Sequence, residues 1–289
     1  MNESGFLGGG IGPTAIKRRS GLAAPVPVAG PELLTNGDFS SWTGDNPTDW
    51  GISGTETGTT YISESAGRCR LVTDGPIIAM SQNVLTAGAW YTTTVDVAAA
   101  SGFVGWLFGG TNPIINYFAS GARFAAGRAA DATFQVKRAG GACDAIFDNI
   151  TCRALTLASL FSTHPYASAN CDLSAAITRT AGTQAGLVAR LDSATSPANF
   201  IIAYLDGVGN VKVDKCVAGT YTNVISGAVT YSAGKVLRLV CSGNSVSAYY
   251  DGAQVGSTVT VSDAGIVSNT RHGLFSTYAA NSFAGYVAA

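Results

Sequence analysis

Apolar and polar residues alternate with a period of two over most of the chain after residue 31. In the stretch YTTTVDVA at residues 91–98, Val95 and Val97 lie on one face, whereas Thr94 and Asp96 lie on the other. Side chains of a β-strand point alternately to its two faces, so this pattern predicts a half-buried strand. The same alternation occurs in the segments RCRLVT, IIAMSQNV, ATFQVKR and CDAIFDNITCRA, which are separated by Gly, Asn and Asp turns.

The second half of the chain repeats this alternation in the segments GLVARLD, NFIIAYLD, NVKVDK, VLRLVC and SVSAYYDG. In VLRLVC, Leu237 and Leu239 point one way and Arg238 points the other. Short strands at intervals of about 8 to 12 residues, without a helical period, are typical of β-sandwiches. We therefore predict an all-β fold with two tandem antiparallel β-sandwich (jelly-roll) domains, residues 31–155 and residues 156–289.

Residues 1–30 differ from the rest because they have no periodic pattern and are rich in glycine and proline. Such a composition does not form a core. We predict an extended anchoring arm that becomes ordered along another protein, and a flexible terminus is the alternative. Four apolar residues that a plain spacer does not need are the anchoring candidates: Phe6, Leu7, Ile11 and Ile16.

Composition narrows the classes of partner. Charged residues make up 12% of the 289 residues, about half of the roughly 25% usual for soluble domains, and the net charge is -1. Phosphate binding requires a basic face, so nucleic acid is not expected as a partner. No apolar run approaches the roughly 18 residues needed to span a membrane, and no secretory signal pattern is present, so synthesis in a host cytoplasm without membrane insertion is expected.

The six cysteines are scattered, and none forms a CxxC pair. A structural zinc site is therefore not expected. Because most of the cysteines lie in apolar strand-like segments, we predict buried free thiols, with one disulfide within either half left open.

The segments ELLTNGDFSSWT, at residues 32–43, and AIFDNITCRAL, at residues 145–155, resemble the first and last strands of carbohydrate-binding-module jelly rolls of the family 4/9/22 type. This resemblance implies a jelly roll over residues 31–155. It also implies a structural calcium ion held by Asp38 and Asp148, although Ser40 stands where the family often has Glu. No other cofactor is expected.

Residues 156–289 are similar to concanavalin-like and laminin-G-like sandwiches in AGLVARLDS, FIIAYLDG, VLRLVCSGNSVSAYYDGAQVGSTV and RHGLFS. These sandwiches typically end in Phe-Asp-Asn-Phe, whereas this chain has NSFAGYVAA. This chain therefore lacks the aspartate of that motif, which the last strand would need to bind a metal ion or to take part in catalysis.

No set of residues predicts catalysis. A glycosidase needs two paired carboxylates, but the only glutamates are Glu3, Glu32, Glu56 and Glu64, all outside the central strand-like segments. The two histidines do not accompany a GxSxG motif. We therefore expect a protein that is not an enzyme.

Aromatic residues favour glycan binding, because sugars stack on aromatic faces between polar groups. In FVGWLFGG, Phe103 and Leu107 share one face, and Val104, Trp106 and Phe108 share the other, so one face can fill a core while the other lines a groove. Core packing is the alternative for each single residue. The ligand-binding candidates are Trp90, Trp106, Tyr117, Tyr204, Tyr249 and Tyr250.

Taken together, these features resemble those of bacteriophage virion proteins: head fibre, decoration or tail-fibre proteins. The resemblance implies a structural protein attached to other virion proteins through residues 1–30, located in the virion and assembled as a homo-oligomer such as a trimer. Its sandwiches would bind a host-surface glycan for adhesion. A cement protein without a ligand and a soluble glycan-binding accessory module are the alternatives.

Overall fold

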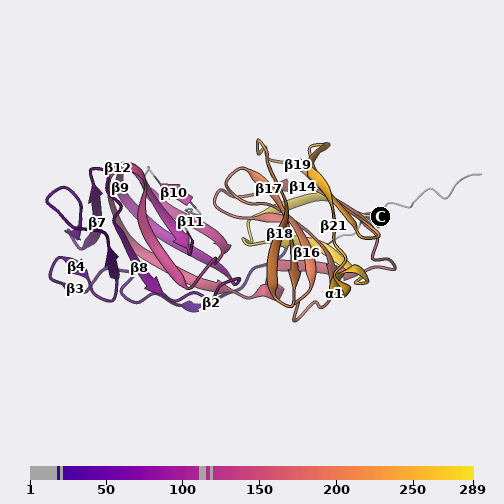
Figure 1. Ribbon diagram of the computed structural model, residues 1–289, viewed down its shortest axis with the longest axis horizontal. Coiled ribbons are helices and arrows are strands. Elements are labelled where there is room, and N and C mark those ends of the chain that lie inside the picture. The colour runs from indigo at the N-terminus through magenta and orange to yellow at the C-terminus, as the bar shows by residue number, and fades with distance from the viewer. Residues whose placement is uncertain (1–17, 20–21, 111–114, 118–119) are drawn as a thin grey trace, which may run out of the picture.

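The computed structural model describes residues 18–19, 22–110, 115–117 and 120–289. The anchoring candidates Phe6, Leu7, Ile11 and Ile16 lie outside the described residues. Within them, the regular secondary structure is almost entirely β-strand, and the strands form two sandwiches that lie end to end along the long axis (Figure 1). The predicted all-β fold class is thus confirmed. No helix among the described residues is long and apolar enough to cross a membrane.

The first sandwich is built around two long antiparallel strands, β9 and β12, which pair with each other over most of their length. Strands β10 and β11 extend the sheet from β9, whereas β2, β7 and β8 pair with β12. The strands of this sandwich are β2 (Ala29–Glu32), β3 (Trp42–Thr43), β4 (Asn46–Pro47), β5 (Gly51–Ser53), β6 (Tyr61–Ser65), β7 (Arg68–Thr73), β8 (Ala79–Asn83), β9 (Trp90–Phe108), β10 (Ile115–Tyr117), β11 (Gly121–Arg128) and β12 (Thr133–Leu155).

The core of the first sandwich is aromatic. Phe39 is 1% exposed and its ring lies 5.8 Å from the rings of both Trp50 and Phe147. The turn before it is tight, because a Cβ at Gly37 would overlap the carbonyl oxygen of Ile150. The NGDF segment that stands out in the sequence therefore inserts an aromatic anchor against the last strand, β12.

The second sandwich consists of two six-stranded sheets, in the orders β1-β23-β14-β19-β20-β21 and β13-β22-β15-β16-β17-β18. Its elements are η1 (Leu157–Leu160), β13 (Phe161–Pro165), β14 (Cys171–Thr178), β15 (Ala185–Leu191), β16 (Phe200–Leu205), β17 (Asn210–Val217), β18 (Thr220–Ala228), β19 (Lys235–Ser242), β20 (Ser245–Tyr250), β21 (Ala253–Thr260), α1 (Ala264–Val267), β22 (Arg271–Ser276) and β23 (Ser282–Ala288). Alternate residues of β14 and β19, such as Leu173 and Leu239, fill the core between the sheets.

The segment that precedes the first sandwich runs along the second one. Strand β1 (Arg18–Arg19) pairs with Val287 and Ala288 of β23, and Val28 donates its N–H to Ser159 Oγ at 2.9 Å. A strand of two residues is too short to show a period-two apolar pattern in the sequence. Strand β1 therefore belongs to the folded body, at the end of the second sandwich where the C-terminus also lies, whereas β2 pairs with β12 of the first sandwich (Figure 1).

Candidate functional site

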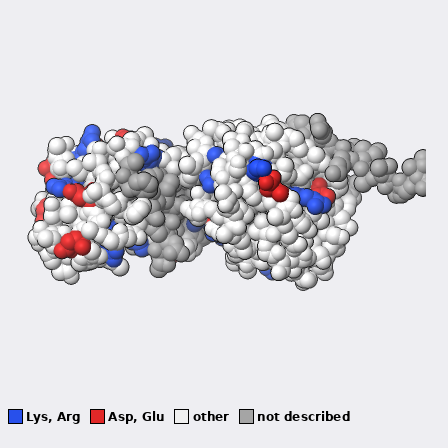
Figure 2. Space-filling view, turned by 90° about the horizontal axis from the view of Figure 1, so that it is seen from above, with Lys and Arg blue, Asp and Glu red and all other residues white. Residues whose placement is uncertain are grey.

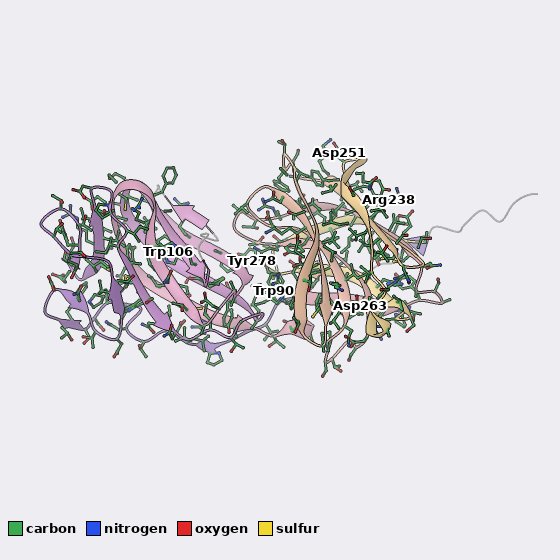
Figure 3. All side chains as sticks on the ribbon, viewed as in Figure 1. Trp90, Trp106, Arg238, Asp251, Asp263 and Tyr278 are labelled. Carbon is green, nitrogen blue, oxygen red and sulfur yellow. The ribbon has the colours of Figure 1, made fainter. Side chains whose placement is uncertain are left out.

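Two of the candidate aromatic residues lie in the cores rather than on a surface that a ligand can reach. Trp106 is 0% exposed in the first sandwich, with its ring 5.7 Å from Phe147 (Figure 3). Tyr250 is 6% exposed, and its hydroxyl bonds to the backbone of Ser232. Packing covers both rings, so neither offers a face to a sugar. Tyr117 belongs to β10, but its side chain lies outside the described residues.

Trp90 and Tyr204 are brought together, although they come from different sandwiches. Their ring centroids are 6.1 Å apart, and Trp90 also lies 5.2 Å from Phe275 and 6.3 Å from Tyr221. The indole N–H donates to Tyr221 Oη at 3.0 Å. Trp90 is only 3% exposed, so it joins the two sandwiches instead of facing solvent (Figure 3).

Polar contacts also cross this junction. The Arg128 guanidinium, from the first sandwich, contacts the buried carboxylate of Asp214 at 3.1 Å and lies 4.2 Å from the centre of the Tyr221 ring. Asp214 also accepts the Tyr204 hydroxyl at 2.9 Å. Burial, together with this carboxylate, raises the pKa of Tyr204. Nearby, the side-chain amide of Gln184, in the second sandwich, donates from Nε2 to the backbone carbonyl of Ala126 in the first sandwich.

The residues proposed for calcium do not form a metal site on their own. The Asp38 carboxylate accepts the N–H and hydroxyl of Ser40, and Asp148 accepts the N–H of Asn149. Calcium takes roughly six to eight oxygen ligands. The described part of the chain contains no group of three or more His, Cys, Asp or Glu side chains that could hold a metal ion, so no third carboxylate joins Asp38 and Asp148.

A hollow of about 440 Å³ lies on the outer face of the first sandwich, and we call it the first hollow. Four neighbouring strands contribute one residue each to a row across its floor. Tyr61 pairs with Val72, Val72 with Asp144, and Asp144 with Ser101. Residues directly opposite one another in a sheet share a face, so these side chains point to the same side.

Two carboxylates, Asp74 and Asp144, line the first hollow together with the half-buried Tyr61. Arg70 donates from Nε to Asp144 Oδ1 at 2.9 Å and from Nη2 to Asp144 Oδ2 at 2.6 Å. This contact holds the pKa of Asp144 below its ordinary value. Hydroxyls of Thr59 and Thr60 donate to Asp74 at 2.8 and 3.1 Å and lower its pKa as well. Both carboxylates therefore stay ionised at neutral pH and accept hydrogen bonds.

The sequence pattern did not identify this site. Tyr61, Asp74 and Asp144 lie in short segments that are far apart in the chain, and only strand register places them together. The sequence does contain one indication of this site, which is a polar residue on the outward face of a strand. In RCRLVT, Arg70 alternates with the fully buried Cys69 and Leu71.

Tyr249 is the one described candidate that is half-exposed. It lies on the outer face of β20, with the Arg238 guanidinium 5.1 Å from the centre of its ring.

The six cysteines are all buried and free, as their positions in apolar segments predicted.

No protein-family model matches this sequence, and a search of curated proteins finds no matching relative. Among solved structures, the chain is distantly similar to the carbohydrate-binding module CBM66 from Bacillus subtilis, with 18% identity, a TM-score of 0.33, and coverage of 44% of this chain and 76% of that one. Sheep galectin-11 in complex with glycerol shares 7% identity at a TM-score of 0.35, over 45% of this chain and 96% of the galectin.

A third structure is the κ-carrageenase from Pseudoalteromonas carrageenovora in complex with an oligotetrasaccharide of κ-carrageenan. It shares 10% identity at a TM-score of 0.28, over 97% of this chain and 86% of that one. Scores this low transfer neither a ligand nor an activity to this chain.

Proposed function

We propose that this chain is a non-enzymatic, glycan-binding adhesion protein of a bacteriophage virion. The first hollow carries the proposal, because it combines the half-buried Tyr61 with two ionised carboxylates, Asp74 and Asp144, on an open sheet face. Arg70 lies beside the hollow and holds Asp144 in place. Sugars present C–H faces that stack on aromatic rings and hydroxyls that donate to carboxylates. The hollow offers both kinds of contact within one row of strands.

The ionisation of the hollow supports binding rather than hydrolysis. A glycosidase needs one carboxylic acid whose pKa is raised, so that it is protonated and can protonate the leaving group. Asp74 and Asp144 have lowered pKa values instead, because hydroxyl groups and Arg70 donate to them. Neither carboxyl is suited to act as a general acid at neutral pH.

The arrangement of the two sandwiches supports display on a particle. Strand β1 enters at the end of the second sandwich, and the first sandwich lies at the opposite end of the molecule (Figure 1). An anchor formed by the residues before β1, in contact with other virion proteins, would therefore hold the first hollow away from the particle. In trimers or other homo-oligomers present in many copies, weak sites gain avidity of roughly 10² to 10⁴.

Binding is tested with a panel of host-surface polysaccharides, using the wild-type chain and the variants Tyr61→Ala and Tyr61→Phe. Aromatic contacts contribute about 0.5–1.5 kcal/mol, so Tyr61→Ala should weaken binding by up to about tenfold. Tyr61→Phe retains the ring and should bind within about twofold of wild type. No binding by the wild-type chain would favour a cement protein without a ligand.

Attachment is tested separately by deleting residues 1–17. The deletion should stop before Arg18, because β1 pairs with β23 and is part of the second sandwich. The truncated chain should fold and bind glycan as the full chain does, but it should be missing from purified particles when measured by mass spectrometry against the major capsid protein. If the truncated chain is incorporated into particles as well as the full chain is, the anchoring proposal is wrong.

A further inference from the structure

The second sandwich carries a charged pair on its outer face. Arg238 of β19 donates from Nε to Asp172 Oδ1 at 2.7 Å and from Nη2 to Asp172 Oδ2 at 2.8 Å. The side chains on either side of it in the strand, Leu237 and Leu239, are fully buried, so the alternation of β19 directs Arg238 outward. Figure 3 labels Arg238 and Asp251 on the upper side of this sandwich, and Figure 2 shows pairs of blue and red on a face that is otherwise white.

A hollow of about 370 Å³ adjoins this pair, and we call it the second hollow. Asp172, Ser174 and Arg238 supply its polar lining, and Val236 and Val287 supply its apolar lining. Val236 is 42% exposed, which is unusual for a large aliphatic side chain in a strand.

The two hollows share one construction. At each hollow, an arginine contacts an aspartate of a neighbouring strand through Nε and Nη2, and a half-buried tyrosine lies on the same sheet face. Arg70 lies beside the lining of the first hollow, and Tyr249 lies beside the lining of the second. Arg70, Asp144 and Tyr61 form this set in the first sandwich, where Tyr61 and Asp144 both line the hollow. Arg238, Asp172 and Tyr249 form it in the second, where the guanidinium lies over the tyrosine ring.

We propose that the second hollow is a second glycan-binding site and that its ligands are neutral sugars. The inference rests on the proposed function, because it assigns to the second hollow the role proposed for the first. The Arg238–Asp172 pair carries no net charge, so it gives an anionic glycan no electrostatic advantage. Its remaining carboxylate lone pairs and guanidinium N–H groups match the donors and acceptors of adjacent sugar hydroxyls. Val236 and Val287 match the C–H face of the ring.

Two sites on one chain have a consequence for avidity. The two sandwiches are in direct contact through Trp90 and Arg128, so both hollows are presented on one connected surface. A polysaccharide that occupies one hollow raises the effective concentration of its own repeats at the other. Binding to an immobilised polymer should therefore be much tighter than binding to a short oligosaccharide.

The test uses isothermal titration of the full chain with neutral oligosaccharides cut from dextran, mannan and galactan, and with oligosaccharides of alginate as the acidic probe. The wild type should bind two neutral oligosaccharides per chain and no acidic one. Arg238→Gln should reduce this number to one and should weaken adhesion to the immobilised polymer at least tenfold. Tyr249→Ala, beside the hollow, should weaken binding at the second site by up to about tenfold. Arg238 and Asp172 are 44% and 35% exposed, so these changes leave the core intact.

Lys235→Gln is the matched control, because it breaks the exposed Lys235–Asp251 pair on the same sheet outside the second hollow. It should still bind two oligosaccharides. If the wild type binds one oligosaccharide per chain, and Tyr61→Ala weakens that binding while Arg238→Gln leaves it unchanged, the second site is overturned but the proposed function is kept. Binding of alginate in preference to every neutral probe overturns the assignment to neutral sugars. If no probe binds, the proposed function fails together with this inference.

Discussion

Replacing Trp90 with alanine should uncouple the two sandwiches. The indole is 3% exposed and contacts three aromatic rings of the second sandwich, Tyr204, Tyr221 and Phe275. Truncation of a buried tryptophan to alanine costs about 3–5 kcal/mol. Loss of its hydrogen bond to Tyr221 Oη adds about 1 kcal/mol. Because the ring belongs to the junction, this loss should reduce the coupling between the sandwiches more than the stability of either one.

Differential scanning calorimetry and small-angle X-ray scattering measure the two effects. The wild type should unfold in one transition or in two that overlap, whereas Trp90→Ala should show two separated transitions and a larger radius of gyration. Trp106→Ala is the matched control, since it removes an equally buried indole from the core of the first sandwich. It should lower the stability of that sandwich without changing the shape of the folded chain.

The reasoning is refuted if Trp90→Ala leaves the scattering curve and the overlap of the transitions unchanged. Such a result would mean that contacts such as Arg128–Asp214 and Gln184–Ala126 hold the junction without the indole. A triple variant that also carries Arg128→Met and Gln184→Ala would then be expected to separate the transitions.

Three further predictions concern the folded chain. Burial lowers the pKa of His272, whose Nδ1 accepts the N–H of Arg190 at 3.0 Å. The unfolded chain therefore binds a proton more readily at this histidine than the folded chain does. The free energy of unfolding should decrease as pH falls below about 6.5, the ordinary pKa of histidine. Urea titrations at several pH values should show a weaker decrease for His272→Gln than for wild type. Gly186→Ala should destabilise the second sandwich by at least about 1–3 kcal/mol, because its Cβ would overlap the Ala203 carbonyl oxygen, and Gly140→Ala, which meets no atom, should stay within about 0.5 kcal/mol. Iodoacetamide should label the six buried thiols in urea but not in the native chain, and rapid native labelling read by mass spectrometry would contradict the burial.

The sequence predicted the second sandwich in some detail. Segments such as VLRLVC and GLVARLD became β19 and β15, because period-two alternation and turn residues act within a few positions of one another. In FVGWLFGG the face with Trp106 and Phe108 fills the core, and Phe103 on the other face is 44% exposed. Leu107 shares the face of Phe103 and is nevertheless fully buried, a difference that alternation alone does not predict.

Local pattern determined the class of fold and the positions of most strands, because a strand's alternation records which of its faces is buried. It did not determine which buried aromatic residue packs within a sandwich and which joins two of them. Trp90 and Tyr204 meet only because 113 positions of intervening chain fold back between them. The same holds for Tyr61, Val72 and Asp144, which share a face through the register of three strands, and register depends on packing across the whole sheet.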